Sequence, residues 1–334
     1  MTFPVPAPAG SPDTPDPRAL LEKVERLRSE IHRVIVGQER VIEELLVTLL
    51  AGGHGLLRGV PGLAKTMLVK TVADATHLSF KRIQFTPDLL PSDVTGSEVL
   101  DDAGGKKELR FLKGPVFVNL LLADEINRTA PKTQAALLEA MQERQVTVGG
   151  VPYALPTPFC VLATQNPIEQ EGTYPLPEAQ LDRFLLCIAV DYPAEDEEVS
   201  ILKATTGHLS DAVSPVLDVA GIGELQSLVR DVPVAEDLVR DVVRLVRGSR
   251  AGEGAAPLAK KWIEWGAGPR AGQALLLSAK ALALLSGRFA VSRQDLERLA
   301  APVLRHRLVL SYAASAEGIS TDEVVRQLVL WAKL

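Results

Sequence analysis

The sequence predicts an α/β fold in which a five-stranded parallel sheet is followed by an all-α region. Five short apolar runs alternate with helical stretches as far as residue 193, which is the pattern of a parallel sheet buried on both faces. The first of these runs leads into a glycine-rich turn and then a helical stretch, residues 54–77. Beyond Pro193 the strand signals stop, and helical patterns fill the rest of the chain.

The five expected strands are short and rich in Leu, Ile, Val and Phe. They cover residues 54–59, 79–86, 118–126, 159–167 and 184–193.

Helix signals accompany these strands. An amphipathic pattern starts at Arg18, and a second helix is expected over 35–53, where paired glycines end it. Pro131 is placed to open a helix over 131–144. In the C-terminal region two segments that begin with Ser292 and Ser320 resemble capping boxes, with Asp295 and Glu323 as the paired acids.

Composition and pattern divide the chain into three expected parts. Residues 1–17 are rich in Pro and Ala and lack an apolar period, so we expect a disordered tail. The α/β part is expected to span residues 18–193 and the helical part residues 194–334.

Overall composition excludes several classes of protein. A net charge of −6 argues against a general nucleic-acid or anionic-membrane binder. Cys160 and Cys187 form no disulfide framework, and the five histidines share no metal-ligand spacing. The most apolar helical stretch, 274–286, is interrupted by Lys280, so no membrane span is expected. With no positively charged leader visible, we expect a cytoplasmic protein.

The segment GVPGLAKT, residues 59–66, is close to the phosphate-loop pattern G-x-x-x-x-G-K-[ST]. In such a loop, backbone N–H groups and the helix that follows face the phosphates. Lys65 is expected to reach the β and γ phosphates, and the Thr66 hydroxyl to ligate Mg²⁺. The predicted nucleotide-binding residues here are Gly59, Val60, Pro61, Gly62, Leu63, Ala64, Lys65, Thr66 and Met67.

Ala64 departs from the pattern, which has glycine at this position. We expect this residue to open the following helix with a negative φ, where alanine carries no left-handed strain and is the better helix former. Its methyl group is then a tolerable addition near the phosphates.

Two carboxylates close the strand LLLADEIN. Asp124 is placed to hold Mg²⁺ through water, and Glu125 to orient or deprotonate an attacking water. Alone, an acidic pair at a strand end is common. Together with the loop it indicates ATP and Mg²⁺ as ligands.

Three further polar residues follow in the chain. Asn166, after the strand that ends in ATQNP, is placed to hold the water beside Glu125. Arg183 precedes the last strand. Taken alone, its position favours a surface ion pair with Asp182 or Glu178; the alternative is that it supplies charge to the γ-phosphate of a neighbouring subunit. Arg270 starts a helix, where its charge opposes the helix dipole and favours an anionic partner.

In this order, these residues resemble the motifs of AAA+ ATPases: Walker A at Lys65–Thr66, Walker B at Asp124–Glu125, sensor 1 at Asn166, arginine finger at Arg183 and sensor 2 at Arg270. The sequence resembles the MoxR family over about residues 20–325. The segments that carry this resemblance are GVPGLAKT, LLADEINRTAPKTQAALLEAMQE, ATQNP, LPEAQLDRF and GPRA.

The resemblance has further implications. The MoxR-type loop carries alanine at the position of Ala64, and the VGQ of Val36, Gly37 and Gln38 lies near the adenine. Segments 97–117 and 143–156 resemble the helix-2 insert and the pre-sensor-1 hairpin of this clade, both facing the pore of a ring. Arg128 is expected either to form a local salt bridge or to touch the neighbouring site.

The resemblance implies an ATPase with an α/β core and a helical lid, forming a homo-oligomeric ring that is expected to contain six subunits. MoxR relatives act as chaperone-like remodelers of protein complexes or in metal-cofactor maturation, often with a separate partner that carries a von Willebrand factor A domain. A nucleic-acid-dependent motor is one alternative, against which the net charge and the uncharged tip Gly149-Gly150-Val151 speak; Lys106 and Lys107 are weak evidence for it. A nucleotide switch that does not hydrolyse ATP is the other.

Overall fold

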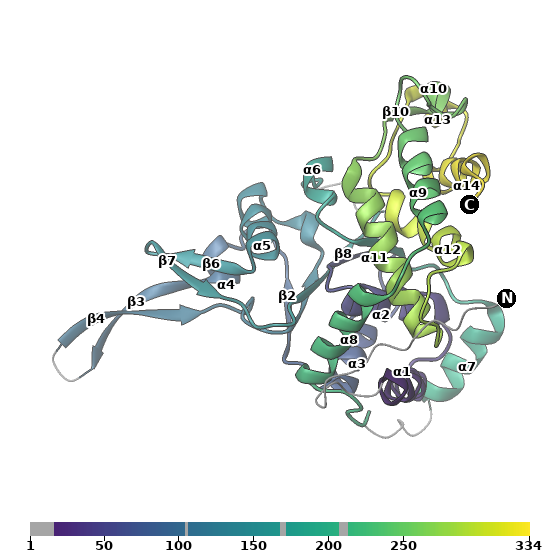
Figure 1. The fold of residues 1–334 in the computed structure, drawn as a ribbon. Helices are drawn as coiled ribbons and strands as arrows, with labels where there is room; N and C mark the ends of the chain where they lie inside the picture. The colour runs from purple at the N-terminus through teal and green to yellow at the C-terminus, as the bar shows by residue number, and fades with distance from the viewer. Residues whose placement is uncertain (1–16, 104–105, 168–171, 207–212) are drawn as a thin grey trace.

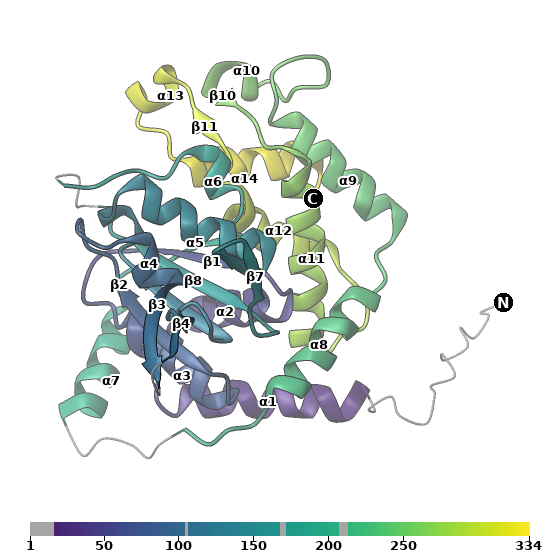
Figure 2. The same cartoon turned by 90° about the vertical axis from the view of Figure 1, so that its left-hand side faces the viewer.

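The computed structural model of the chain describes residues 17–103, 106–167, 172–206 and 213–334. The expected tail therefore lies outside the described residues except for Pro17, with which α1 begins. Figures 1 and 2 show the fold from two directions.

A five-stranded parallel sheet forms the centre of the fold, as the sequence predicts. Its strands are β1 (Gly55–Arg58), β2 (Phe80–Gln84), β5 (Leu120–Asp124), β8 (Cys160–Gln165) and β9 (Leu186–Ala189). They lie in the order β2-β5-β8-β1-β9, so the first strand of the chain is inserted between the last two. This order brings the carboxyl ends of β5, β8 and β1 together, which is where ligands bind in open parallel sheets.

Apolar side chains alternate between the two faces of the sheet, because successive residues of a strand point to opposite sides. On one face, Leu57, Leu122 and Ile188 belong to a core shared with the helices α1 (Pro17–His32), α2 (Glu39–Leu50) and α3 (Lys65–Ala75). On the other face, Leu56 and Leu121 pack with residues of α5 (Pro131–Glu143), such as Leu137. Both faces of the sheet are therefore buried.

Two β-hairpins interrupt the α/β alternation and project from the same side of the molecule (Figure 1). The first, β3 (Gly96–Ala103) with β4 (Lys106–Lys113), follows the short helix α4 (Pro91–Thr95). The second pairs β6 (Gln145–Val148) with β7 (Val151–Ala154). The rings of Phe111 and Tyr153 lie 4.3 Å apart between centroids, so the two hairpins contact each other.

Two glycines form the tip of the β6–β7 hairpin. Gly149 and Gly150 both have positive φ, 57° and 82°, which suits a tight two-residue turn. The expected Gly104-Gly105 turn lies outside the described residues.

Beyond β9 the chain is mostly helical. Figure 2 shows α8, α9 and α11 along one side of the sheet domain. The helices are α7 (Glu195–Thr206), α8 (Val219–Asp231), α9 (Glu236–Gly248), α10 (Ala259–Trp262), α11 (Pro269–Leu285), α12 (Arg293–Leu304), α13 (Tyr312–Ala316) and α14 (Thr321–Ala332). Apolar residues of several of these helices join the core that covers one face of the sheet.

The expectation of an all-α region was wrong in one detail. β10 (Ile263–Trp265) and β11 (Val309–Leu310) form a two-stranded antiparallel sheet. Strands of three and two residues are too short to produce a recognisable alternation of apolar and polar residues.

The expected helix starts are found at both serines. Ser292 and Asp295 form a reciprocal capping box, in which each side chain accepts a hydrogen bond from the backbone N–H of the other residue. The Ser320 hydroxyl accepts from the Glu323 N–H and caps α14. Across the residues that the structure covers, no helix is both long and apolar enough to cross a membrane.

Candidate active site

Three segments that are distant in the sequence meet in a cavity of about 350 Å³ at the carboxyl ends of β1, β5 and β8. They are the loop before α3, the end of β5 and the end of β8. The lining residues are Pro61, Gly62, Leu63, Ala64, Lys65, Thr66, Arg82, Asp124, Glu125, Thr164 and Asn166. The structure thus brings together most of the predicted phosphate, metal and water-positioning residues.

The loop shapes one wall of this cavity. Gly62 has a φ of +85° and open space where a Cβ would lie, so the backbone is accessible there. The Lys65 ammonium donates to the carbonyl oxygens of Gly59 at 2.5 Å and of Val60 at 3.2 Å, and so closes the loop on itself. Burial lowers the pKa of Lys65, while the carboxylates of Asp124 and Glu125 act in the opposite direction.

The expected backbone of Ala64 was wrong. Ala64 is the N-cap of α3, with φ 51° and ψ 25°, in the left-handed region. An L-residue there has its Cβ close to the carbonyl oxygen, at a cost of roughly 1–2 kcal/mol. The loop pattern calls for glycine at this position because of this backbone, and alanine tolerates the strain instead of avoiding it.

Asp124 is 9% exposed, and three side-chain donors hold its carboxylate. The Arg82 guanidinium donates twice to Oδ2, at 3.0 and 2.7 Å, and the Thr164 hydroxyl donates to Oδ1 at 2.6 Å. Both carboxylate oxygens are therefore fixed by side chains of the two neighbouring strands.

Glu125 also has a left-handed backbone, with a φ of 57°. Its N–H donates to the Thr164 hydroxyl at 2.8 Å. Its Oε2 accepts from the Gln84 amide at 2.7 Å and from Arg128 at 2.9 Å. Of the two roles expected for Arg128, this structure contains the local salt bridge. Strained non-glycine residues such as Ala64 and Glu125 gather at functional sites.

Asn166 is buried and lines the same cavity as Glu125. It follows β8, whose neighbour in the sheet is β5, the strand that ends at Asp124. The carboxyl ends of neighbouring parallel strands meet at one edge, so the sequence expectation of proximity holds.

Other predicted nucleotide contacts lie outside this cavity. Gly59 and Val60 line an adjoining one of about 240 Å³, and Met67 lines a third of about 780 Å³ beside α3. Val36, Gly37 and Gln38 form the segment before α2, where the Gln38 N–H donates to Glu197 of α7 at 3.3 Å.

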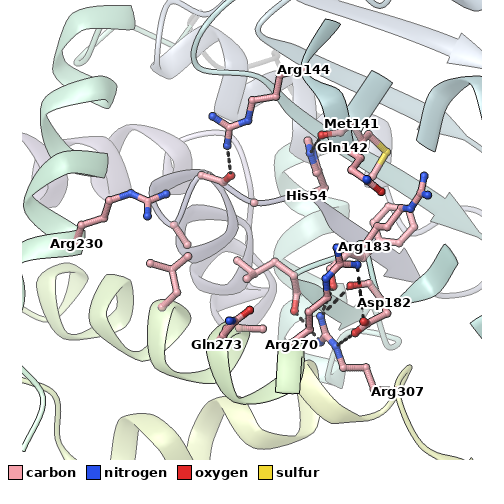
Figure 3. A pocket seen from close by; sticks show the side chains of 17 residues that line it. His54, Met141, Gln142, Arg144, Asp182, Arg183, Arg230, Arg270, Gln273 and Arg307 are labelled. Carbon is pink, nitrogen blue, oxygen red and sulfur yellow. Dashed lines mark hydrogen bonds and ion pairs between the residues drawn. The ribbon is translucent and has the colours of Figure 1, made fainter. Parts of the chain in front are cut away.

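Arg183 and Arg270 do not reach the loop of their own chain. Both line a cavity of about 330 Å³, which also contains Gly53 and His54 (Figure 3). These two residues precede β1, and Arg183 precedes β9, so this cavity lies at the amino ends of the strands. The Leu185 N–H donates a backbone hydrogen bond to the His54 carbonyl, and the Val190 N–H donates one to the Arg58 carbonyl. The two ends of this strand pair are therefore roughly 13–16 Å apart at ~3.3 Å per residue.

Asp182 organises this second cavity. Its carboxylate accepts from Arg307 at 2.7 Å and lies 3.9 Å from Arg270. Arg307, only 4% exposed, also donates to the Phe184 and Leu185 carbonyls. Arg183 itself has no ion pair within the described parts of the chain, so the alternative of a salt bridge with Asp182 or Glu178 is not found.

Sequence reasoning missed several residues of these sites. Arg82 and Gln84 are two apart on an expected strand, so they share a face, and Thr164 bears the same relation to Asn166. This spacing of two residues is a signal that could have identified Arg82, Gln84 and Thr164 as site residues. Arg307 lies 125 residues from Asp182, and nothing in the sequence connects the two.

Comparisons with known proteins agree with this geometry. Residues 54–186 match the ATPase family associated with various cellular activities (AAA), and residues 255–328 match the AAA lid domain. The chain is 45% identical over 312 residues to the protein named Chaperone MoxR1 of Mycobacterium tuberculosis, covering 93% of this chain and 82% of that one. It is 35% identical to Protein MoxR of Paracoccus denitrificans, covering 85% and 87%.

A solved structure agrees as well. The crystal structure of a candidate ATPase from Cytophaga hutchinsonii is 42% identical, with a TM-score of 0.87, and the match covers 94% of this chain and 95% of that one. Matches of this identity and coverage, together with the shared domains, establish that the chain belongs to the MoxR family of AAA+ ATPases.

Proposed function

We propose that this chain binds ATP with Mg²⁺ and hydrolyses it to ADP and phosphate. The observation that carries the proposal is the meeting of the loop, the Asp124–Glu125 pair and Asn166 in one cavity of about 350 Å³. Each group supplies a different requirement of phosphoryl transfer, namely phosphate binding, metal binding and water positioning.

Phosphate binding falls to the loop and the start of α3. The helix is 11 residues long, and its first N–H groups and dipole face the cavity and favour an anion. The Lys65 ammonium, which now bonds to the Gly59 and Val60 carbonyls, exchanges these acceptors for the β and γ phosphates. Lys65 therefore already lies at the wall of the cavity where the phosphates would bind.

The residues present also fit Mg²⁺. Thr66 and Asp124 offer hydroxyl and carboxylate oxygens, the ligands that this hard cation prefers, and both line the cavity. Because Asp124 already accepts from Arg82 and Thr164, we expect it to hold the ion through water. The bound ion would neutralise charge that develops on the phosphate oxygens.

Glu125 and Asn166 carry the chemical step. The oxygen of a water bonds to the γ-phosphorus as the bond to the bridging oxygen of ADP breaks, and Glu125 accepts the water proton. Gln84 and Arg128 both donate hydrogen bonds to Oε2 of Glu125. These two contacts fix the plane of the carboxylate and therefore the direction of Oε1. Asn166 orients the water from the adjacent strand.

Arg183 and Arg270 line a cavity at the opposite ends of the strands, and these strands are roughly 13–16 Å long by their rise per residue. Neither can serve the nucleotide of its own chain in this conformation. We infer that they act on the ATP of a neighbouring subunit, which requires a closed homo-oligomer with head-to-tail interfaces, most simply a ring of six.

We further propose a chaperone-like role in remodelling protein complexes or maturing metal cofactors, working with a separate protein that carries a von Willebrand factor A domain. A relative with 45% identity bears the name of a chaperone, which supports the first part. A nucleic-acid motor is less well supported, because the net charge is −6 and the β6–β7 tip is Gly149 and Gly150.

ATP turnover by the full chain tests the proposal. Wild-type protein should release phosphate from ATP, and Glu125→Gln should bind ATP as tightly but turn it over at least about 100-fold more slowly. Lys65→Ala should lose affinity for both ATP and ADP, because it removes a phosphate contact. Wild-type turnover by Glu125→Gln would exclude Glu125 as the group that positions water. Strong DNA stimulation with steep salt dependence would favour the motor instead.

A further inference from the structure

The cavity that contains Arg183 and Arg270 carries much more positive than negative charge. Five arginines line it, and Asp182 is the only acidic residue among its described lining residues. The arginines are Arg144, Arg183, Arg230, Arg270 and Arg307. His54 adds no positive charge, because burial lowers its pKa to about 4. Such a cavity matches a ligand with several negative charges, and arginine binds phosphate oxygens in pairs.

Among these five arginines, Arg144 lies at the end of α5, next to the β6–β7 hairpin. It is the C-cap of α5, with a φ of 53°, and comes from a different element than Arg183 or Arg270. Figure 3 shows its side chain on one side of the cavity and Arg270 and Arg307 on the other. Three elements therefore direct arginines into the same space.

The present partner of Arg144 is weak. Its guanidinium donates to the Gly52 carbonyl at 3.4 Å, a long bond to a neutral acceptor. Among the residues that the structure describes, no carboxylate lies within ion-pair distance of Arg144. The side chain is exposed, so it can exchange this bond for a better acceptor at little cost.

We propose that Arg144 contacts the triphosphate of the ATP bound to the neighbouring subunit, as a third arginine beside Arg183 and Arg270. The inference rests on the proposed function, since it needs ATP at the interface. It adds a contact from the helix α5, which begins six residues after Glu125 and ends at the β6–β7 hairpin.

The backbone of Arg144 connects the proposed phosphate contact to the β6–β7 hairpin. The Arg144 carbonyl accepts from the Leu155 N–H at 3.0 Å and closes the base of the hairpin. A shift of Arg144 toward a neighbour's phosphates is therefore transmitted directly to β6 and β7. The hairpin of one subunit would respond to the nucleotide of the next.

Steady-state turnover of the assembled protein is the first test. Arg144→Ala should lower kcat by about 10- to 100-fold, the value of one or two hydrogen bonds to a charged group. Its affinity for ADP should not change, because the loop of its own chain is intact. Arg144→Lys keeps the charge but loses the paired donors, so it should retain an intermediate rate. As a matched control, Arg240→Ala removes an exposed arginine on α9 and should behave as wild type.

Subunit mixing is the second test, because a defect in folding or assembly cannot be complemented in trans. Arg144→Ala subunits mixed with Glu125→Gln subunits, across several ratios, should regain activity. Arg183→Ala with Glu125→Gln is the reference mixture. If the reference recovers and the Arg144 mixture does not, the role of Arg144 is wrong and the proposed function stands. If neither recovers, the trans arrangement fails, and the inference fails with it. Wild-type turnover by Arg144→Ala also overturns the inference.

Discussion

The Asp182 carboxylate accepts a hydrogen bond at 2.7 Å from Arg307, which follows α12, and Asp182 is the chain neighbour of Arg183. One contact thus ties the helical region to the residue that directly precedes Arg183. The same carboxylate lies 3.9 Å from Arg270. Two arginines from different parts of the chain are therefore held relative to each other by a single acid. Burial lowers the pKa of Arg307, and the bond to Asp182 opposes that shift.

Asp182→Asn should consequently lower ATP turnover by at least about 10-fold without changing ADP affinity. Arg270 loses its ion-pair partner, and the backbone that leads into Arg183 loses its anchor on Arg307. The unfolding free energy should fall by about 1.5–3 kcal/mol, since a charged hydrogen bond to a buried arginine is lost. Turnover, ADP titration and denaturant unfolding measure the three quantities.

Asp241→Asn is the matched control for this prediction. Asp241 is buried and pairs with Arg244 at 3.0 Å and Arg293 at 2.8 Å, away from both cavities. It should lose stability by a similar amount and keep its turnover at temperatures where the protein is folded. Equal turnover losses in the two variants would mean that Asp182 acts through stability alone.

Ala64→Gly should keep nucleotide affinity and raise the unfolding free energy by up to about 1 kcal/mol, because glycine adopts the left-handed backbone of position 64 without strain. Ala64→Val should lose about 1–3 kcal/mol and bind ATP more weakly, since a β-branched residue is poorly tolerated at positive φ. Denaturant unfolding and nucleotide titration check both.

Ala220→Val, at an exposed position of α8, separates this effect from the general cost of valine in a helix. That control should lose no more than about 0.7 kcal/mol. Equal stabilities of the two valine variants would show that the backbone of residue 64 is not strained.

Stability should fall as the pH decreases from about 6.5 to 4 because of His54. Its Nδ1 accepts from the Val161 N–H at 3.0 Å, its Nε2 lies 3.3 Å from the Met141 carbonyl, and burial lowers its pKa to about 4. Between these two pH values the unfolded chain binds a proton that the folded chain does not. The unfolding free energy should therefore decrease by about 1.4 kcal/mol per pH unit from this residue.

His54→Gln cannot gain that proton, so its stability should depend less steeply on pH over the same range. His306 contributes in the same direction, because burial and Arg307 lower its pKa well below the ordinary value. Part of the slope should therefore remain in the variant. Denaturant unfolding at half-unit pH steps measures the difference, and identical slopes would mean that His54 is already charged in the folded protein.

Much of the fold could be predicted because local signals and tertiary packing agree. The apolar runs around Leu57, Leu122 and Ile188 are strands, and the loop at Lys65 follows β1 and opens α3. The backbone of Ala64 was wrongly predicted because helix propensity was given more weight than the positive φ that the loop pattern requires of its glycine.

The separation of Arg183 and Arg270 from the loop could not be read from the sequence. It depends on which end of a strand each residue lies at and on the place of β1 between β8 and β9, and strand order leaves no local pattern. The proximity of Asp182 and Arg307 has the same origin, since the contact forms only after the helical region packs on the sheet.

The central claim, that each ATP site is completed by the neighbour's Arg183, is tested most directly by mixing two inactive variants. Arg183→Ala should lose ~10³- to 10⁵-fold in rate. Glu125→Gln subunits keep a sound Arg183, and Arg183→Ala subunits keep a sound site. After equal mixing with free exchange, about a quarter of the interfaces in a closed ring pair a sound site with a sound arginine, so activity should return. If labelled subunits exchange and every mixing ratio stays as inactive as its parents, the composite site is contradicted.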